Sequence, residues 1–233
     1  VLYIMNIFSY DKFHRNYERL YEVEAMVTYF NGDRFLKEPL SASLTDVLKA
    51  NVPEMESVTR IASQSYKLIA GDKSFTENGI YADDNFLEVF TFPLASAAGA
   101  NGLSDNNSIM ISERTALKLF ETTDCIGKML VLDDDSKQEA YKIAGILRDV
   151  PQQSLLQFDF VIPFQKFLAA NNWANETGAS ANQIWILFRS NTNIGKVNSK
   201  IKDLIKNQET TLNQELFLFP MKEKTLYSYA GEK

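Results

Sequence analysis

Residues 20–29 read Leu-Tyr-Glu-Val-Glu-Ala-Met-Val-Thr-Tyr, so that apolar or aromatic residues alternate with polar ones. Tyr, Val and Ala occupy the odd-numbered positions, whereas Glu22, Glu24 and Thr28 occupy even-numbered ones, with Met26 as the exception. A period of two residues is typical of a strand with one buried and one exposed face. The stretch therefore predicts a half-buried β-strand.

A helix and a second strand follow this strand. An apolar face at helical spacing predicts a helix from about Ser43, with Asp46 as a weak capping-box partner. Residues 57–64 read as another strand, so the region forms one βαβ unit, although the strands at 20–29 and 57–64 could also be paired differently. The residues on the apolar face of this helix are Leu44, Val47 and Leu48.

A second βαβ unit is predicted near the other end of the chain. Residues 183–189 favour a strand, Asn193 is a suitable N-cap for the helix after it, and residues 216–221 favour the closing strand. The apolar residues at helical spacing are Ile194, Val197, Ile201, Leu204 and Ile205. Two βαβ units joined head to tail make a ferredoxin-like split βαβ arrangement.

The segment between the two units is too long to be a loop, since roughly 120 residues separate them. A strand is expected at 108–111, and two further strands at 129–132 and 140–147 enclose a hairpin tip at 133–136. Ser112 is expected to cap a helix with Ala116, Leu117, Leu119 and Phe120 facing inward. The middle therefore predicts an inserted mixed α/β subdomain, and the whole chain an α/β (α+β) fold.

The composition excludes several classes of protein. The chain has 233 residues, of which 45% are hydrophobic and 23% charged, and its 16 Phe and 10 Tyr argue against disorder. The net charge is −6 and no cluster of Lys and Arg occurs, so nucleic acid is not expected as a partner. Cys125 is the only cysteine, which excludes an internal disulfide framework and a cysteine-based zinc site.

Residues that could carry chemistry are few. His14 is the only histidine, which excludes a multi-histidine metal site and weakens any Ser-His-Asp triad, so a packing role is expected. The acidic run Asp133–Asp135 lacks the alternating ligands and the glycine of a calcium loop, which favours a solvated turn. Cys125 has no histidine near it in sequence, so we expect an inert thiol.

Three acidic residues could form the carboxylate pair of a glycoside hydrolase: Asp83, Asp84 and Glu88. They flank a short amphipathic helix, where adjacent acids usually face water, so a hydrolase is the weakest hypothesis. No glycine-rich phosphate-binding pattern occurs. The sequence therefore predicts no catalytic, cofactor-binding or metal-binding residue and no cofactor, and the chain is not expected to be an enzyme.

Four motifs in a fixed order cover most of the chain. They are residues 9–14 with Asn16, Arg19, Leu20 and Tyr21; residues 82–94 with Phe86, Phe90 and Phe92; residues 107–120 followed by Ile126, Gly127 and Lys128; and residues 145–151 followed by Ser154 and residues 156–160. On these motifs the chain resembles the MacB-like periplasmic core domain of bacterial ABC-transporter permeases of the MacB/FtsX type, in a form common in the Bacteroidetes. Glu121 and Cys125 depart from the family's usual Gly and Pro, and both fall in one loop.

The resemblance implies a domain organisation. Residues 1–19 would be the end of a first transmembrane helix and a linker. As a helix, the mainly apolar run at residues 1–8 rises only roughly 12 Å, so it cannot span a bilayer by itself. Residues 20–66 and 151–233 would be the two halves of a Porter-like subdomain, and residues 67–150 an inserted Sabre-like subdomain. The C-terminus would lead to the second transmembrane helix.

The resemblance also implies a function: a non-catalytic periplasmic domain of an inner-membrane transporter. It would pass the movement caused by cytoplasmic ATP hydrolysis to the periplasm, by a mechanism called mechanotransmission. The implied partners are a cytoplasmic ABC ATPase, a second permease copy and the membrane, with a periplasmic adaptor and an outer-membrane channel as further candidates. The aromatic residues Tyr10, Phe13, Tyr17 and Tyr21 would pack the end of the first helix onto the sheet.

An alternative function remains open. An extracytoplasmic domain of this size could instead sense a ligand for a membrane receptor. Such a domain requires a defined apolar pocket, and its melting temperature should rise when the ligand binds.

Overall fold

The computed structural model describes residues 9–97, 102–134, 136–206 and 213–224. The chain divides into two compact units, of which unit 1 comprises Val1–Arg60 and Ala170–Lys233, and unit 2 comprises Ile61–Ala169. Unit 2 is thus inserted into unit 1 in sequence. Within the described ranges, no helix has the length and apolar character needed to cross a bilayer.

The main sheet of unit 1 has the strand order β11-β1-β10-β3, with β1 antiparallel to both of its neighbours. The strands are β1 (Leu20–Thr28), the first part of β3 (Met55–Ala70), β10 (Gln183–Phe188) and β11 (Asn213–Pro220). Because β10 lies between β1 and β3, the first βαβ unit is split by a strand of the second. The predicted α/β fold is therefore confirmed.

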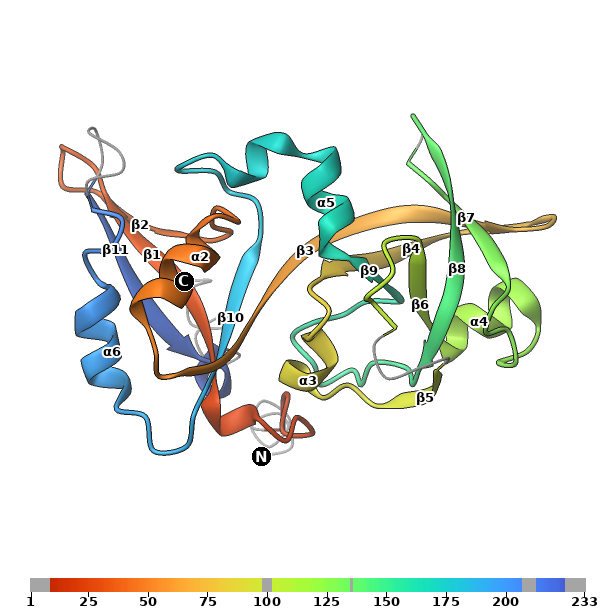
Figure 1. Cartoon of the computed structure of the whole chain (residues 1–233), viewed down its shortest axis with the longest axis horizontal. Coiled ribbons are helices and arrows are strands. Elements are labelled where there is room, and N and C mark those ends of the chain that lie inside the picture. The colour runs from red at the N-terminus through yellow and green to blue at the C-terminus, as the bar shows by residue number, and fades with distance from the viewer. Residues whose placement is uncertain (1–8, 98–101, 135, 207–212, 225–233) are drawn as a thin grey trace. The chain divides into compact units, whose positions relative to one another are not determined.

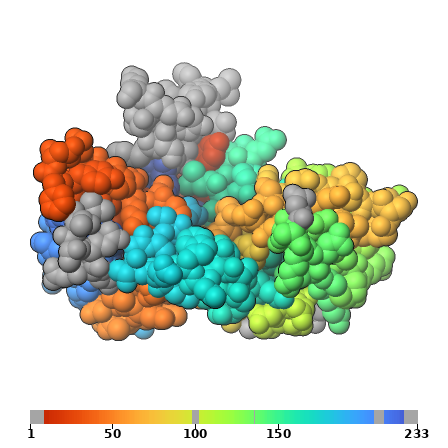
Figure 2. Space-filling view, turned by 90° about the horizontal axis from the view of Figure 1, so that it is seen from above, coloured from red at the N-terminus to blue at the C-terminus, as the bar shows by residue number. Residues whose placement is uncertain are grey.

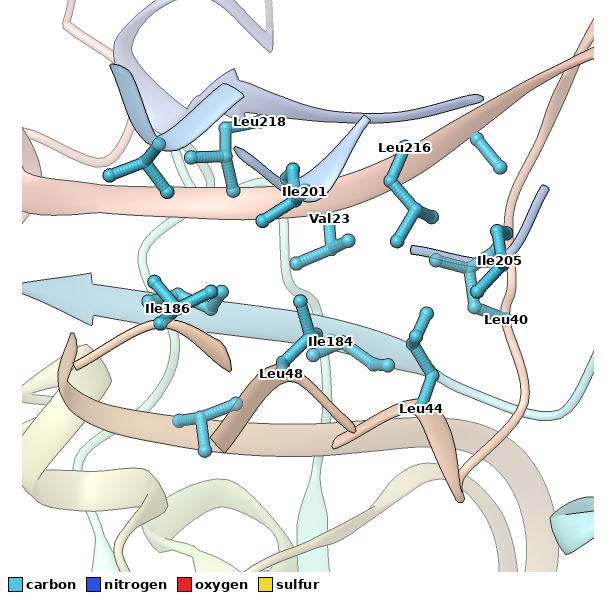
Figure 3. Packing of buried hydrophobic residues seen from close by; sticks show 14 of the residues in the cluster. Val23, Leu40, Leu44, Leu48, Ile184, Ile186, Ile201, Ile205, Leu216 and Leu218 are labelled. Carbon is cyan, nitrogen blue, oxygen red and sulfur yellow. The ribbon is translucent and has the colours of Figure 1, made fainter. Parts of the chain in front are cut away.

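Two helices cover one face of this sheet: α2 (Leu44–Asn51) and α6 (Ile194–Ile201). Alternate residues of the strands point toward the helices and form a single hydrophobic core with them, which Figure 3 shows from close by. The residues labelled there are Val23, Leu40, Leu44, Leu48, Ile184, Ile186, Ile201, Ile205, Leu216 and Leu218. The period of two in residues 20–29 thus places Val23 and Ala25 in the core, as predicted.

Shorter elements complete unit 1. They are a 3-10 turn η1 (Tyr17–Arg19), strand β2 (Arg34–Lys37) and a second 3-10 turn η2 (Asn172–Asn175). The β2 strand pairs with the last part of β1 to form a hairpin. Phe30 at the tip of this hairpin is 88% exposed, and Figure 2 shows the hairpin in orange-red at the molecular surface.

Six strands of unit 2 close into a ring by pairing in the order β3-β4-β9-β6-β8-β7, after which β7 pairs again with β3. The strands are the remainder of β3, β4 (Lys73–Ala82), β6 (Ser108–Ser112), β7 (Met129–Asp133), β8 (Gln138–Leu147) and β9 (Phe160–Pro163), and β5 (Leu94–Ala97) pairs with β8 outside the ring. Figure 1 shows several of them in yellow and green. Gly79 leaves space for the Phe160 ring, because a Cβ there would lie 2.0 Å from Phe160 Cζ.

Three helices are attached to these strands: α3 (Phe86–Phe90), α4 (Glu113–Phe120) and α5 (Phe164–Ala170). The expected cap of α4 is present, because Ser112 Oγ accepts a hydrogen bond from Thr115 N at 3.1 Å. The expected hairpin tip between β7 and β8 is also present: Asp134 Oδ1 accepts bonds from the backbone N–H groups of Ser136 and Lys137.

Some details of the sequence prediction were wrong. Leu117 of α4 points to solvent and is 52% exposed, whereas Ala116 and Leu119 are buried. Ser43 makes no capping bond, because its backbone is already helical and its Oγ lies 2.8 Å from Ser41 Oγ. The strand expected at residues 57–64 runs from Met55 to Ala70, since its second part forms a hairpin with β4.

The two compact units meet at residues 60/61 and 169/170. The predicted subdomain limits were 66/67 and 150/151. The Porter-like and Sabre-like identities of the units remain predictions.

Candidate functional site

The chain enters and leaves the sheet of unit 1 at the same end. The first residues of β1 pair with the last residues of β11, with Tyr21 opposite Pro220. The described N-terminal segment, residues 9–19, therefore joins the sheet beside residues 221–224, which form one turn of helix after β11. Lys222 in this turn lies with its Nζ 3.6 Å from Glu18 Oε2 in η1. Both terminal segments thus contact one end of one sheet.

Arg19 attaches the N-terminal segment to the sheet. Its Nη1 donates to the backbone carbonyl of Phe188 at 2.8 Å and also pairs with Glu56. Its Nη2 donates to Asn16 Oδ1 at 3.1 Å, which fixes the 3-10 turn that precedes β1. One side chain therefore links the N-terminal segment to β10 and to the first part of β3.

Lys224 attaches the C-terminal turn to the sheet. Its Nζ lies 2.7 Å from Glu22 Oε2, 2.6 Å from Glu24 Oε1 and 2.7 Å from Glu38 Oε2. Glu22 and Glu24 belong to β1, and Glu38 directly follows β2. We call these four residues the Lys224 cluster.

Glu22 and Glu24 of the Lys224 cluster are buried on the face of the sheet opposite to the helices, whereas Glu38 at the edge of the cluster is exposed to solvent. Glu22 is 0% and Glu24 1% exposed, and the Lys224 side chain is 14% exposed. The cross-strand partners of Glu22 are Trp185 on β10 and Phe219 on β11, so the carboxyl group lies between two aromatic residues. Lys224 Nζ also lies 5.6 Å from the centre of the Phe219 ring, where a cation is attracted to the π-electrons.

Burial and charge shift the protonation of this cluster. Burial raises the pKa of Glu22 to about 8, with smaller contributions from Glu38 and Glu24, although Lys224 acts in the opposite direction. Burial also raises the pKa of Glu24. Burial alone would lower the pKa of Lys224, but the three glutamates raise it. Burial therefore favours the protonated form of Glu22, and the three glutamates favour the charged form of Lys224.

The cluster is an ion-pair site. The carboxylate oxygens of Glu22, Glu24 and Glu38 lie within 4.8 Å of one another, close enough to share one cation. The ammonium group of Lys224 contacts all three carboxyl groups and supplies that positive charge. The observed contacts are therefore those of an ion-pair site that holds the C-terminal turn to the sheet.

The aromatic residues predicted to pack the N-terminal segment onto the sheet are all half-buried: Tyr10, Phe13, Tyr17 and Tyr21. Tyr21 packs edge-on against Phe188 of the hydrophobic core, with ring centres 5.6 Å apart. Phe13 lies against the neighbouring His14 ring at 4.0 Å. The apolar run at residues 1–8 lies outside the described residues.

His14 is a buried packing residue. It is 2% exposed, and burial lowers its pKa to about 3, so the ring is neutral at physiological pH. Its Nε2 lies 3.7 Å from Asp11 Oδ1, which is also buried. A histidine sealed from solvent in this way is poorly placed to transfer protons.

The other candidate residues lie in unit 2. Asp84 and Glu88 are exposed beside α3 and Asp83 is half-buried, whereas the apolar residues of α3 point inward. Burial raises the pKa of the Cys125 thiol, which suits an inert side chain. Asp133 and Asp134 form the hairpin tip, and Asp135 lies outside the described residues.

The motif residues of unit 2 make structural contacts with one another. Phe158, from the last motif, packs edge-on against Phe92 at 4.9 Å and against Phe86 at 5.8 Å. Asp149 Oδ1 accepts a bond from Arg114 N in the first turn of α4, and Asp159 pairs with the Arg114 side chain. These motifs therefore build the fold of unit 2.

Unit 1 also contains a small cavity of about 210 Å³. Its lining combines apolar residues of α2 with polar groups that include Lys37, Ser41 and Ser43. Ligand pockets usually measure about 300–1,000 Å³ and are mainly apolar. This cavity is smaller and more polar than such a pocket.

Sequence reasoning missed the Lys224 cluster. The alternation in residues 20–29 placed Glu22 and Glu24 on one face, and a polar face normally lies in water. Lys224 is 200 residues away from Glu24 in sequence, so no local pattern connects them. A signal was nevertheless present, because two glutamates at alternate positions of a strand require a cation if that face is covered.

Comparisons with known proteins agree with this architecture. A domain of a protein described as a permease from Porphyromonas gingivalis matches with a TM-score of 0.77 and 21% identity, covering 89% of this chain and 91% of that one. The periplasmic region of MacB from Actinobacillus actinomycetemcomitans matches with a TM-score of 0.64 and 17% identity, covering 94% and 96%. No curated protein matches in sequence.

A third solved structure is similar, the extracellular domain of the noncanonic ABC-type transporter YknZ from Gram-positive bacteria. Its TM-score is 0.59 and its identity 13%, over 84% of this chain and 99% of that one. The model of the MacB-like periplasmic core domain family matches residues 2–204. The chain therefore belongs to the MacB-like periplasmic core domain family, whose members are extracytoplasmic parts of ABC-transporter permeases.

Proposed function

We propose that this chain is a non-catalytic periplasmic lever, which passes the movement of an ATP-driven permease into the periplasm. The observation that supports this most is the attachment of both terminal segments to one end of the unit 1 sheet. Arg19 holds the first segment and Lys224 the second. A displacement of either segment would therefore act directly on β1, β10 and β11.

The chemistry of the candidate residues supports a role without catalysis. The single histidine is buried and neutral, and the motif residues of unit 2 are engaged in caps and aromatic packing. The proposed partners are a cytoplasmic ABC ATPase and a second copy of the permease. A periplasmic adaptor and an outer-membrane channel would extend the path across the envelope. The proposed location is the periplasmic side of a bacterial inner membrane, with unit 1 as the Porter-like subdomain and unit 2 as the Sabre-like one.

Replacing Phe13 and Tyr17 together with Ala in the intact transporter tests this proposal. The half-buried rings stiffen the segment between the membrane and β1, so their loss should leave ATP hydrolysis active while transport per ATP falls severalfold. ATP hydrolysis would be measured in membranes that contain the transporter. Transport would be measured by how well the variant restores the transport function of cells that lack the native gene.

A matched control replaces one Phe and one Tyr elsewhere on the surface, namely Phe75 and Tyr29, which are 39% and 47% exposed. This control should keep normal coupling. Unchanged coupling in a folded Phe13/Tyr17 variant would contradict the lever function.

Under the alternative, a ligand-sensing domain, the small polar cavity of unit 1 that Lys37 lines could hold a small polar ligand. A ligand at a hundred times its dissociation constant stabilises a protein by about 2.7 kcal/mol, which in a chain of this size raises the melting temperature by about 5–10 °C. A screen of small polar molecules against the isolated chain would detect such a rise. Loss of the rise in Lys37→Met would assign the ligand to this cavity, whereas a screen without any shift would argue against sensing.

A further inference from the structure

The ion pairs of the Lys224 cluster connect the C-terminal turn to the sheet. An ammonium group has three N–H donors, and Lys224 directs its charge at two carboxyl groups on β1 and one that directly follows β2. Lys222 in the same turn is exposed and makes only a longer contact with Glu18. Lys224 therefore links residues 221–224 to β1 and to the end of β2, beside the buried side chain of Met221.

The cluster contains more acidic groups than basic ones. Two buried carboxyl groups and the solvent-exposed one of Glu38 face one lysine, so the buried groups alone would carry one negative charge in excess if every group were ionised. Uncompensated charge is costly in a buried site, and binding a proton removes part of it. Glu22 is the group best placed to hold this proton, since its cross-strand neighbours Trp185 and Phe219 carry no charge. The charged groups that face it are Lys224, Glu24 and Glu38.

We propose that the Lys224 cluster is a proton-controlled latch, which holds the C-terminal segment to the sheet and releases a proton from Glu22 when it opens. Opening moves Lys224 away and admits water to Glu22, so the burial that favours the protonated carboxyl is lost. The latch should therefore hold more tightly in acid and more weakly in alkali.

Linkage gives the expected size of this effect. Glu22 has a pKa of about 8 in the closed latch, and a carboxyl in water has one of about 4.5. Between these values each opening event releases one proton, so the opening equilibrium rises by up to about tenfold per pH unit. Below about pH 4.5 and above about pH 8 the dependence should level off.

The role of this latch in transport rests on the proposed lever function, but the latch itself can be tested without it. If opening is measured in the isolated 233-residue chain, the result does not depend on ATP hydrolysis or cargo. Failure of the latch would leave the lever to act through Arg19 and η1. If the lever function fails, the latch remains as a pH-dependent contact of the C-terminal turn that plays no part in transport.

The test measures how often the C-terminal turn leaves the sheet. Met221 is 1% exposed in this turn, so a cysteine there reacts with a thiol reagent only when the turn opens. The variant Met221→Cys is made together with Cys125→Ser. Its labelling rate, divided by that of an unfolded peptide of the same sequence at each pH, gives the opening equilibrium from pH 5 to 9.

We expect the opening equilibrium to rise about tenfold or more between pH 6 and pH 8. Glu22→Gln should remove most of this rise, because an amide cannot release the proton and leaves only the smaller contribution of Glu24. Lys224→Met should raise the opening at every pH, whereas the matched control Lys222→Met should not. Glu215→Gln is the matched control for the acid, since Glu215 lies on β11 and pairs with Lys202 outside the cluster.

A rise of less than about threefold between pH 6 and pH 8 would overturn the proposal, as would an equal rise in Glu22→Gln. The comparison of the parent with Glu22→Gln decides the matter even where Lys224→Met does not fold, because the amide keeps the shape of the carboxyl group.

Discussion

Glu22 shows how one residue departs from the pattern in which it is found. Residues 20–29 alternate as a half-exposed strand does, yet Glu22 is fully buried because the second face of the sheet is covered as well. The carboxyl group remains there because Lys224 lies beside it and because it can hold a proton. We therefore expect this side chain to make the stability of unit 1 depend on pH.

The variant Glu22→Gln should change this pH dependence. The pKa of Glu22 is raised from 4.5 to about 8 in the folded chain, so the folded state binds more protons than the unfolded state between these values. Stability from this group is fully present below pH 4.5 and is lost as pH rises to about 8. Thermal unfolding at pH 5 and pH 8.5 measures the effect.

The melting temperature of Glu22→Gln should lie close to that of the parent at pH 5 and exceed it by about 10 °C or more at pH 8.5, since one pKa unit is about 1.4 kcal/mol and each kcal/mol corresponds to about 2–4 °C in a chain of this size. If the variant and the parent had the same melting curve at pH 5 and again at pH 8.5, the pKa of Glu22 would not be raised in the folded chain.

Among the helices and strands, the two serines predicted as helix N-caps differ in whether they form the capping hydrogen bond. Ser112 and Ser43 both precede a helix, but only Ser112 accepts a bond from the helix backbone. Ser112→Ala should therefore lower the free energy of unfolding by about 1 kcal/mol, whereas Ser43→Ala should change it by much less. Urea unfolding of the two variants provides the measurement, and equal losses would contradict the assignment of the caps.

Periodicity predicted the elements that bury one face. Strands β1 and β10 and helices α2, α4 and α6 were all expected near their observed positions, and Asn193 caps α6 through a bond from Lys196 N at 3.0 Å. The second half of β3 was missed because several of its residues are exposed and its hairpin is held by backbone pairing with β4. Such a strand leaves no apolar pattern to find.

The candidate site was beyond the reach of local patterns for a different reason. The aromatic residues of the N-terminal segment were named from the sequence, and Tyr21 does pack on Phe188. The Lys224 cluster joins residues from both ends of the chain, and only the order β11-β1-β10 brings them together. The topology must therefore be known before the ion pairs can be found.

In the molecule as a whole, the two terminal segments that the structure describes, residues 9–19 and 221–224, have the most consequential position. Unit 1 is assembled from both ends of the chain, and unit 2 is inserted between its halves. Both terminal segments meet the sheet of unit 1 at one end, where Tyr21 pairs with Pro220. The β1–β2 hairpin lies at the opposite end of β1 and is exposed. Movement of the terminal segments should thus appear at the hairpin as a displacement of the entire sheet.

The most direct test of the lever measures this displacement in the intact transporter with its ATPase. A spin label is attached through Phe30→Cys at the hairpin tip, in a Cys125→Ser background. The distance between the labels on the two copies of the permease is measured by pulsed electron paramagnetic resonance. We expect the distance distribution to differ between the nucleotide-free and the ATP-bound transporter, and the Phe13/Tyr17 double variant to lose this difference. An identical distribution in both states, in a labelled transporter that still hydrolyses ATP, would contradict the lever function.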